Sequence, residues 1–285
     1  MKMKRLVATT STSCLDYYKH DYDIRTIRIK IDMGDHVFKD DGTEIKADEF
    51  YKAMEEDKHL VPKTSQPSLG ELIEFFEGIA DEGYEEVIVT TISSKLSGTY
   101  NGICQAKEML ADRINIIPFD TKTVCFNEGY FALNAAKMIE EGVDTKDILA
   151  KLEYLKSHVS IFFAVDSLEC LVKNGRLSGA AGLIGKYLKI KPILRVEPDG
   201  TIQAIEKIRT TKKALEEVGN YLLEYTKGHD YEAFIVYTGT ELKEFLVNTL
   251  KEKFNIEGLA EYPCSPVVGC HVGPNAIGLG VFLKD

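Results

Sequence analysis

Segments with the pattern of β-strands alternate with amphipathic helical segments along most of the chain, and this alternation constrains the fold most strongly. Short β-rich apolar runs occur at residues 6–10, 86–92 and 114–119. Between the first two lies a helical pattern that begins at Ser68, where Glu71 three residues later completes a capping box. Strands that alternate with helices are typical of an α/β fold with a largely parallel sheet.

The pattern changes near residue 158. Two strands, at residues 193–197 and 201–208, flank the turn sequence Pro198-Asp199-Gly200 and predict a hairpin. We therefore predict two α/β domains: residues 1–158, with a mostly parallel sheet and flanking helices, and residues 159–285, an α/β sandwich that contains the hairpin. The other predicted strands are 25–31, 159–165 and 233–238, and the other predicted helices are 47–57, 99–110, 128–141, 145–157, 211–225 and 241–254.

The net charge of −10, from 45 acidic and 35 basic residues, argues against a nucleic-acid-binding protein, because basic groups supply most of that affinity. Residues 173–213 are the exception, with ten basic and three acidic residues. Lys186, Lys189, Lys191 and Arg195 cluster within this segment. Two interpretations remain open, a solvated surface or a docking face for an acidic partner or a phosphate.

The six cysteines are scattered and form no C-x-x-C pair. Cys264 and Cys270 stand closest together, but no second pair completes a zinc site. Scattered thiols predict a reducing compartment, so we expect a cytoplasmic protein. The basic start is followed by the polar residues 9–13, which does not match the apolar region of a signal peptide.

Residues 264–283 contain no charged side chain, a length that would suit a membrane helix. However, Pro266, Pro274 and four glycines would break such a helix. The segment is therefore predicted to be a buried loop and strand near a binding site.

Four stretches combine small hydroxyl residues, glycine or proline: residues 62–68, 93–100, 175–179 and 269–274. In the first two, a strand leads into a helix N-terminus, whose free N–H groups favour an anion. Hydroxyls of Thr64, Ser65 and Ser97 add donors there, so a carboxylate could be held without Arg or Lys. The alternative is that these hydroxyls only cap helices and form turns.

His271 stands between Gly269 and Gly273, which predicts a fixed turn rather than a helix face and directs the imidazole toward one place. A hydrolase with Ser97 as nucleophile is disfavoured because Ser97 lacks the G-x-S-x-G context. The phosphate-binding glycine motifs of nucleotide enzymes are absent as well.

These stretches, in this order, resemble the DegV family of bacterial fatty-acid-binding proteins, and the resemblance covers essentially the whole chain. The chain departs from the family pattern at three places. The family's N-terminal Asp-Ser-Thr-Ala-Asp corresponds to residues 10–14 without either acid, its Gly-Gly-Arg to Asn174-Gly175-Arg176, and its Gly-Pro-Gly after the histidine to Gly273-Pro274-Asn275. The residues that carry the resemblance are Lys63-Thr64-Ser65-Gln66-Pro67-Ser68, Ser93-Ser94-Lys95-Leu96-Ser97-Gly98-Thr99-Tyr100, Gly175-Arg176-Leu177-Ser178, Ile190-Lys191-Pro192-Ile193-Leu194 and His271-Val272-Gly273-Pro274.

The resemblance implies a protein without catalysis of its own that buries one long-chain fatty acid, such as palmitate, stearate or oleate. It implies that the carboxylate is held by the residues matching Thr64, Ser65, Ser97, Gly98 and His271. It further implies a separate fatty acid kinase that phosphorylates the bound acid for phospholipid synthesis. Arg176 and Arg209 would face that kinase or the phosphate.

No metal or organic cofactor is expected, and a transient contact with a membrane stays open. The alternative function is a small-molecule kinase or transferase with its own activity, which the sheet-and-loop arrangement would also permit.

Overall fold

The computed structural model describes residues 3–34, 36–57, 59–178 and 190–284. Lys186 and Lys189 of the predicted basic cluster, and Gly179 of the third motif, lie outside the described residues. Within the described part, no helix is both long and apolar enough to cross a membrane.

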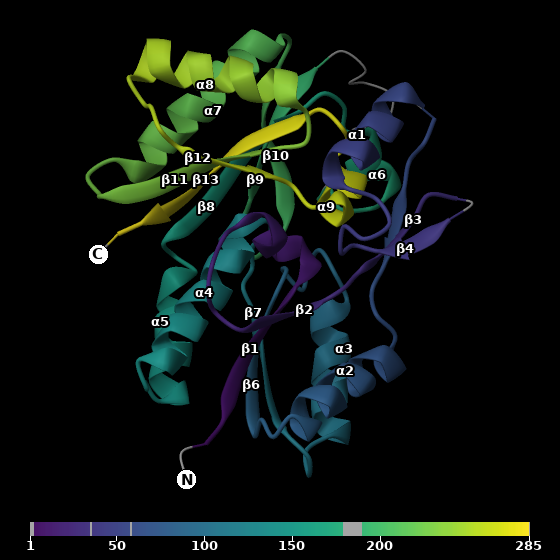
Figure 1. The fold of residues 1–285 in the computed structure, drawn as a ribbon. Helices are drawn as coiled ribbons and strands as arrows, with labels where there is room; N and C mark the ends of the chain where they lie inside the picture. Colours follow the sequence, from purple (N-terminus) through teal and green to yellow (C-terminus); the bar gives the residue numbers. More distant parts are fainter. Residues whose placement is uncertain (1–2, 35, 58, 179–189, 285) are drawn as a thin grey trace.

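A four-stranded parallel sheet with the order β2-β1-β6-β7 forms the centre of the first half (Figure 1). Helices α2 and α3 pack on one face of it, and α4 and α5 lie on the other. The Ser68 hydroxyl accepts from the Glu71 N–H at the start of α2, so the predicted capping box is confirmed. The bounds are β1 Arg5–Thr10, β2 Ile24–Ile27, α2 Leu69–Asp81, β6 Glu86–Thr91, α3 Thr99–Met109, β7 Asn115–Asp120, α4 Phe126–Glu140 and α5 Thr145–Leu155.

The predicted single strand at residues 25–31 is wrong, because the chain there forms two strands in two different sheets. β2 pairs with β1, whereas β3 (Lys30–Asp32) is the middle strand of a small antiparallel sheet, β4-β3-β5. Between them, the Arg28 guanidinium bonds the Asp16 carboxylate at 2.6 Å, and the Ile29 N–H donates to the Ser11 hydroxyl. These contacts hold the chain where it crosses from one sheet to the other. The remaining strands of the small sheet are β4 Val37–Lys39 and β5 Lys63–Ser65.

A six-stranded sheet with the order β10-β9-β8-β13-β11-β12 organises the second half. Its neighbours are mostly antiparallel, and β9 and β10 form the predicted hairpin. Helices α7 and α8 cover one face, at the top of Figure 1. The bounds are β8 Val159–Val165, β9 Lys191–Val196, β10 Ile202–Ile208, α7 Thr211–Thr226, β11 Tyr231–Tyr237, α8 Thr240–Phe254, β12 Ala260–Pro263 and β13 Ala276–Leu283.

The other face of this sheet packs toward the first half, and one hydrophobic cluster contains residues from both halves. The change of sheet at Val159 lies beside the predicted boundary at residue 158, but the shared core means that the two-domain division stays a prediction. Helices α1 (Ala47–Glu56), α6 (Glu169–Lys173) and α9 (Pro266–Val272) gather beside β3 and β4 (Figure 1). The fold is thus mixed α/β, with a parallel sheet and a larger mixed sheet.

Candidate functional site

A buried cavity of about 330 Å³ lies between the six-stranded sheet and loops of the first half, and we call it the slot. Such a volume falls in the usual range for small-molecule sites. Its lining is polar at one end, where side chains are half-buried or exposed, and is otherwise almost entirely buried and apolar. The half-buried or exposed polar residues are Thr64, Ser65, Gln66, Ser97, Arg176 and His271, and we call this end the mouth.

Thr64 and His271 meet at the mouth, although 207 positions separate them in the chain. The Thr64 hydroxyl lies 2.9 Å from His271 Nε2. His271 Nδ1 is buried and has no hydrogen-bond partner among the residues that the structure describes. The imidazole therefore keeps one nitrogen free for a group that enters the slot.

The prediction that His271 occupies a turn is wrong, because it lies in the last turn of α9. Ser265 precedes the helix and Pro266 is its first residue, where proline needs no N–H partner. Gly273 ends the helix with a φ of 85°, a conformation that favours glycine. The first part of the predicted loop-and-strand segment is therefore a short helix, Pro266–Val272, that carries the imidazole to the mouth.

Side chains from distant segments hold α9 in place. The Tyr51 hydroxyl donates to the carbonyl of Cys264 at 2.8 Å, and a Cβ at Gly269 would come within 2.2 Å of the Tyr51 ring. The Asn174 amide donates to the carbonyls of Pro62 and Cys270. Asn174 thus connects the strand of Thr64 with the helix of His271.

Burial, together with the nearby Arg176 guanidinium, lowers the pKa of His271 to about 4. The imidazole is therefore neutral at physiological pH and donates one N–H. Because a bound anion would favour the charged form, a carboxylate beside His271 would raise this pKa again.

Ser97 lines the mouth from the loop between β6 and α3. Its hydroxyl lies 2.9 Å from that of Thr99 and accepts from the Thr99 N–H. Ser97 therefore has the structural role that was the alternative to carboxylate binding, because its hydroxyl fixes the turn at the start of α3.

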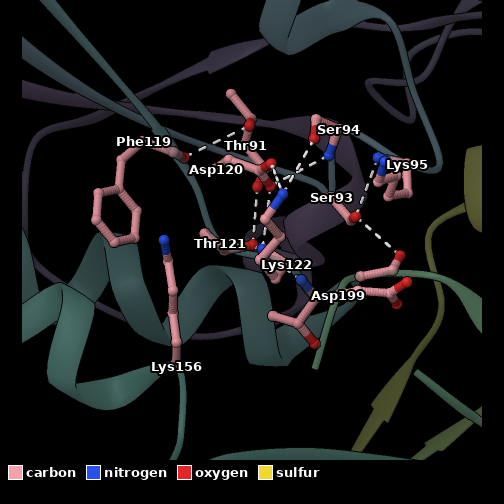
Figure 2. A network of polar contacts seen from close by, with 12 residues as sticks. Thr91, Ser93, Ser94, Lys95, Phe119, Asp120, Thr121, Lys122, Lys156 and Asp199 are labelled. Carbon is pink, nitrogen blue, oxygen red and sulfur yellow. Dashed lines mark hydrogen bonds and ion pairs between the residues drawn. The ribbon is translucent and has the colours of Figure 1, made fainter. Parts of the chain in front are cut away.

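A network of polar contacts holds the loop of Ser97 against both halves of the molecule (Figure 2). The Ser94 N–H donates to Asp120 at 3.1 Å, and Lys122 Nζ lies 2.6 Å from the same carboxylate. Burial would raise the pKa of Asp120, but the bonds from Lys122 and Ser94 outweigh burial and leave this pKa below its usual value. The Ser93 hydroxyl donates to the carbonyl of Gly200, in the hairpin turn of the second half.

The remaining predicted carboxylate contacts differ in position. Ser65 lines the mouth and is exposed. Gly98 does not line the slot but a neighbouring depression, and a Cβ at this position would come within 2.1 Å of Gln66 Oε1. Gln66 lines both, so its amide separates Gly98 from the slot.

Arg176 and Arg209 lie at opposite ends of β10. The loop after Arg176 contacts the start of this strand, because the Ser178 N–H donates to the carbonyl of Ile202. Arg209 is exposed and follows the end of the strand, about 20 Å away at the usual rise per residue. Arg176 itself lines the mouth and donates to the carbonyl of Leu96 at 3.0 Å. A single phosphate cannot contact both arginines.

The N-terminal loop that departs from the family pattern forms a wall of the slot through Thr12. Behind it, the Thr12 hydroxyl donates to the Glu128 carboxyl at 2.6 Å, and Thr10 bonds the same group. Burial raises the pKa of Glu128 to about 8, although the threonine hydrogen bonds act in the opposite direction. A buried, largely protonated carboxyl group therefore supports this wall.

All six cysteines are free thiols. Cys125 and Cys264 line the slot with their sulfurs 4.0 Å apart, whereas Cys270 lies elsewhere in the core. Across the described residues, no group of His, Cys, Asp and Glu could hold a metal ion.

Sequence reasoning missed Tyr51, Asn174 and Glu128. Tyr51 and Glu128 stand in amphipathic helices, where nothing marks a side chain that reaches a distant segment. Asn174 could have been found from the sequence, because it replaces a glycine of the family motif with a side chain that can donate two hydrogen bonds.

Comparisons with known proteins identify one family over nearly the whole chain. The family model of the uncharacterised DegV family matches residues 4–284. A DegV domain-containing protein of Staphylococcus aureus is 34% identical over 98% of this chain and 97% of its own.

Two solved structures are similar throughout. The fatty-acid-binding DegV family protein of Streptococcus agalactiae has a TM-score of 0.89 at 29% identity and covers 99% of this chain and 100% of its own. A stearic-acid-binding protein of Eubacterium ventriosum has a TM-score of 0.82 at 26% identity, with 98% of each chain covered. The sequence match and the shared fold show that this chain belongs to the DegV family.

Proposed function

We propose that the protein binds one long-chain fatty acid, with the acyl chain in the slot and the carboxylate at the mouth. The observation that carries the proposal is the polarity of the slot: a buried apolar cavity with polar groups, all neutral except Arg176, gathered at one accessible end. The fatty-acid-binding proteins of the same fold support it.

Neutral donors are suited to hold the carboxylate. The hydrogen-bonded pair of His271 and Thr64 supplies one donor, because the bond between them uses the proton of the other group, and the Ser97 hydroxyl supplies a second, with Ser65 at the exposed rim. Hydrogen bonds to a charged group contribute roughly 1.5–3 kcal/mol each. Gly98 has no access to the slot past Gln66, so its N–H takes part only if that amide moves aside.

Burial of the acyl chain supplies most of the affinity. Each buried methylene contributes about 0.8 kcal/mol, so a tail of 15 carbons has a ceiling of about 12 kcal/mol. The head-group contacts then fix which end enters first.

We further propose that the bound acid is presented to a partner fatty acid kinase, which forms an acyl phosphate. Arg176 is the better candidate to meet the phosphate, because it lies at the mouth. Arg209 lies far along β10 and would contact the kinase itself.

Calorimetric titration of delipidated protein with palmitate tests the proposal. The expected result is one acid bound per chain, with no ATP required. Absence of binding by a folded, delipidated sample would contradict it, and ATP turnover by the protein alone would favour the alternative of an enzyme.

A further inference from the structure

The apolar interior of the slot adjoins a groove on the outer surface, and β11 shows where the two meet. Val236 lines the slot, and Phe234, two residues earlier, lines a groove on the outer surface. Side chains two residues apart lie on the same face of a strand, about 7 Å apart. Both belong to the core shared by the two halves, whereas Ile235 belongs to the core under α7 and α8.

Three other segments repeat this arrangement. On β13, Gly278 lines the slot and Phe282 lines the groove. At the start of α4, Cys125 lines the slot and Phe126 lines the groove. At the end of β12, Cys264 lines the slot and Tyr262 lines the groove. Behind these slot residues lies a layer of four aromatic residues that line the groove, Phe126, Phe234, Tyr262 and Phe282, and we call this layer the aromatic floor.

The rings of the aromatic floor pack directly on one another. The Phe234 ring centroid lies 5.0 Å from that of Phe126, 5.3 Å from that of Phe282 and 5.9 Å from that of Tyr262. Such distances are typical of favourable aromatic pairs. Phe234 is 2% exposed and Phe126 5% exposed.

Gly280 provides the space for the central ring. A Cβ at this position would come within 2.0 Å of Phe234 Cζ, so only glycine lets the ring lie flat on β13. Beyond the floor, the groove has a volume of about 770 Å³ and opens to solvent through exposed residues such as Lys19 and Lys137.

We propose that the aromatic floor sets the maximum length of the acyl chain, with Phe234 as the central residue. This inference rests on the proposed function, because it assigns the methyl end of the acid to the floor. A chain that reaches the floor meets a packed layer, and extra methylenes in a packed interior cause strain rather than further burial. Without the Phe234 ring, the slot would continue into the groove.

The test measures the affinity of delipidated protein for saturated acids of increasing length, from 12 to 24 carbons. For the unaltered protein, affinity should rise by about fourfold per carbon and stop rising at one length. In Phe234→Leu and Phe234→Ala, the rise should continue for at least two further carbons. Val236→Phe, which extends the floor into the slot, should move the limit to shorter acids.

Phe162→Leu is the matched control, because Phe162 is equally buried on the opposite face of the same sheet. Its length limit should equal that of the unaltered protein. The leucine variant and Val236→Phe keep the test valid if Phe234→Ala does not fold.

The outcomes separate the two proposals. If the unaltered protein binds no fatty acid of any length, the proposed function fails. If it binds fatty acids but Phe234→Leu and Val236→Phe leave the length limit unchanged, the aromatic floor does not set that limit.

Discussion

The two ends of the slot are built in opposite ways. The mouth takes its side chains from a short strand, a loop and a short helix, and hydrogen bonds fix their positions. The floor takes its side chains mainly from strands and a helix start of the rigid core, and ring packing fixes them. This difference indicates that the affinity for the fatty acid and its orientation come from separate regions. The apolar interior favours a long acyl chain, and the mouth determines that the carboxylate end remains accessible.

The largest expected effect concerns the apolar interior. Decanoate has six methylenes fewer than palmitate, so its binding should be weaker by about 5 kcal/mol, three to four orders of magnitude in Kd. Calorimetric titration with both acids measures this difference. Equal affinities would mean that the head group dominates and that the comparison between the two ends is incorrect.

The next effect concerns Glu128, behind the slot wall. Its pKa of about 8 in the folded protein lies above its ordinary value of 4.5, so the folded state keeps a proton that the unfolded chain loses between these pH values. The free energy of unfolding should therefore fall as pH rises from about 4.5 to 8, by an amount on the order of a few kcal/mol. Glu128→Gln cannot ionise and should reduce this slope.

Denaturation by urea at several pH values measures the slope. Buried Asp40, with its pKa raised to about 7 by burial, contributes in the same direction, so part of the slope should remain in Glu128→Gln. His271, with its pKa lowered to about 4, contributes in the opposite direction below pH 6.5, so the contribution of Glu128 is clearest above that pH. Glu140→Gln, on an exposed position of the same helix, should change nothing. A Glu128→Gln profile identical to that of the unaltered protein would show that Glu128 is ionised in the fold.

A smaller effect is expected at the mouth. His271→Ala and Ser97→Ala should each weaken palmitate binding by roughly 1.5–3 kcal/mol, because each removes one hydrogen bond to a carboxylate. Ser94→Ala is the control, since Ser94 lies in the same loop but does not line the slot. Unchanged affinity in folded His271→Ala and Ser97→Ala proteins would assign both residues a purely structural role.

The smallest effect concerns Asn174, which acts through His271. Asn174→Ala removes donors to the carbonyls of Pro62 and Cys270 and should weaken palmitate binding by about 1 kcal/mol. The His271 ring signals in an NMR spectrum should shift as well, because α9 loses a support. A lower melting temperature with unchanged affinity and unchanged ring signals would contradict a positioning role.

Local patterns predicted much of the fold. The buried strand β6 and the capped helix α2 have their periodicity and their cap within a few residues, so the sequence is sufficient there. Hydroxyls at strand ends and the family resemblance also singled out Thr64, Ser65, Ser97 and His271, and these four residues line one cavity. Gln66, another residue of the mouth, was not predicted as a site residue.

Features that depend on distant segments were not predictable. Helix α9 looked like a turn, because Pro266 and the glycines suggest breaks, yet proline is suited to a first helical position. The strand at residues 25–31 divides only because Arg28 and Ile29 find partners at Asp16 and Ser11. The aromatic floor joins residues from Phe126 to Phe282, and no local pattern links them.

The most direct test of the central claim locates the two ends of a bound acid. Palmitate labelled with ¹³C at its terminal methyl group is bound to the protein, and nuclear Overhauser contacts from that methyl group are measured. We predict contacts to Val236 and Phe234 at the floor and none to Thr64 or His271 at the mouth. Contacts to Thr64 or His271, or a methyl group that remains in solvent, would contradict the account.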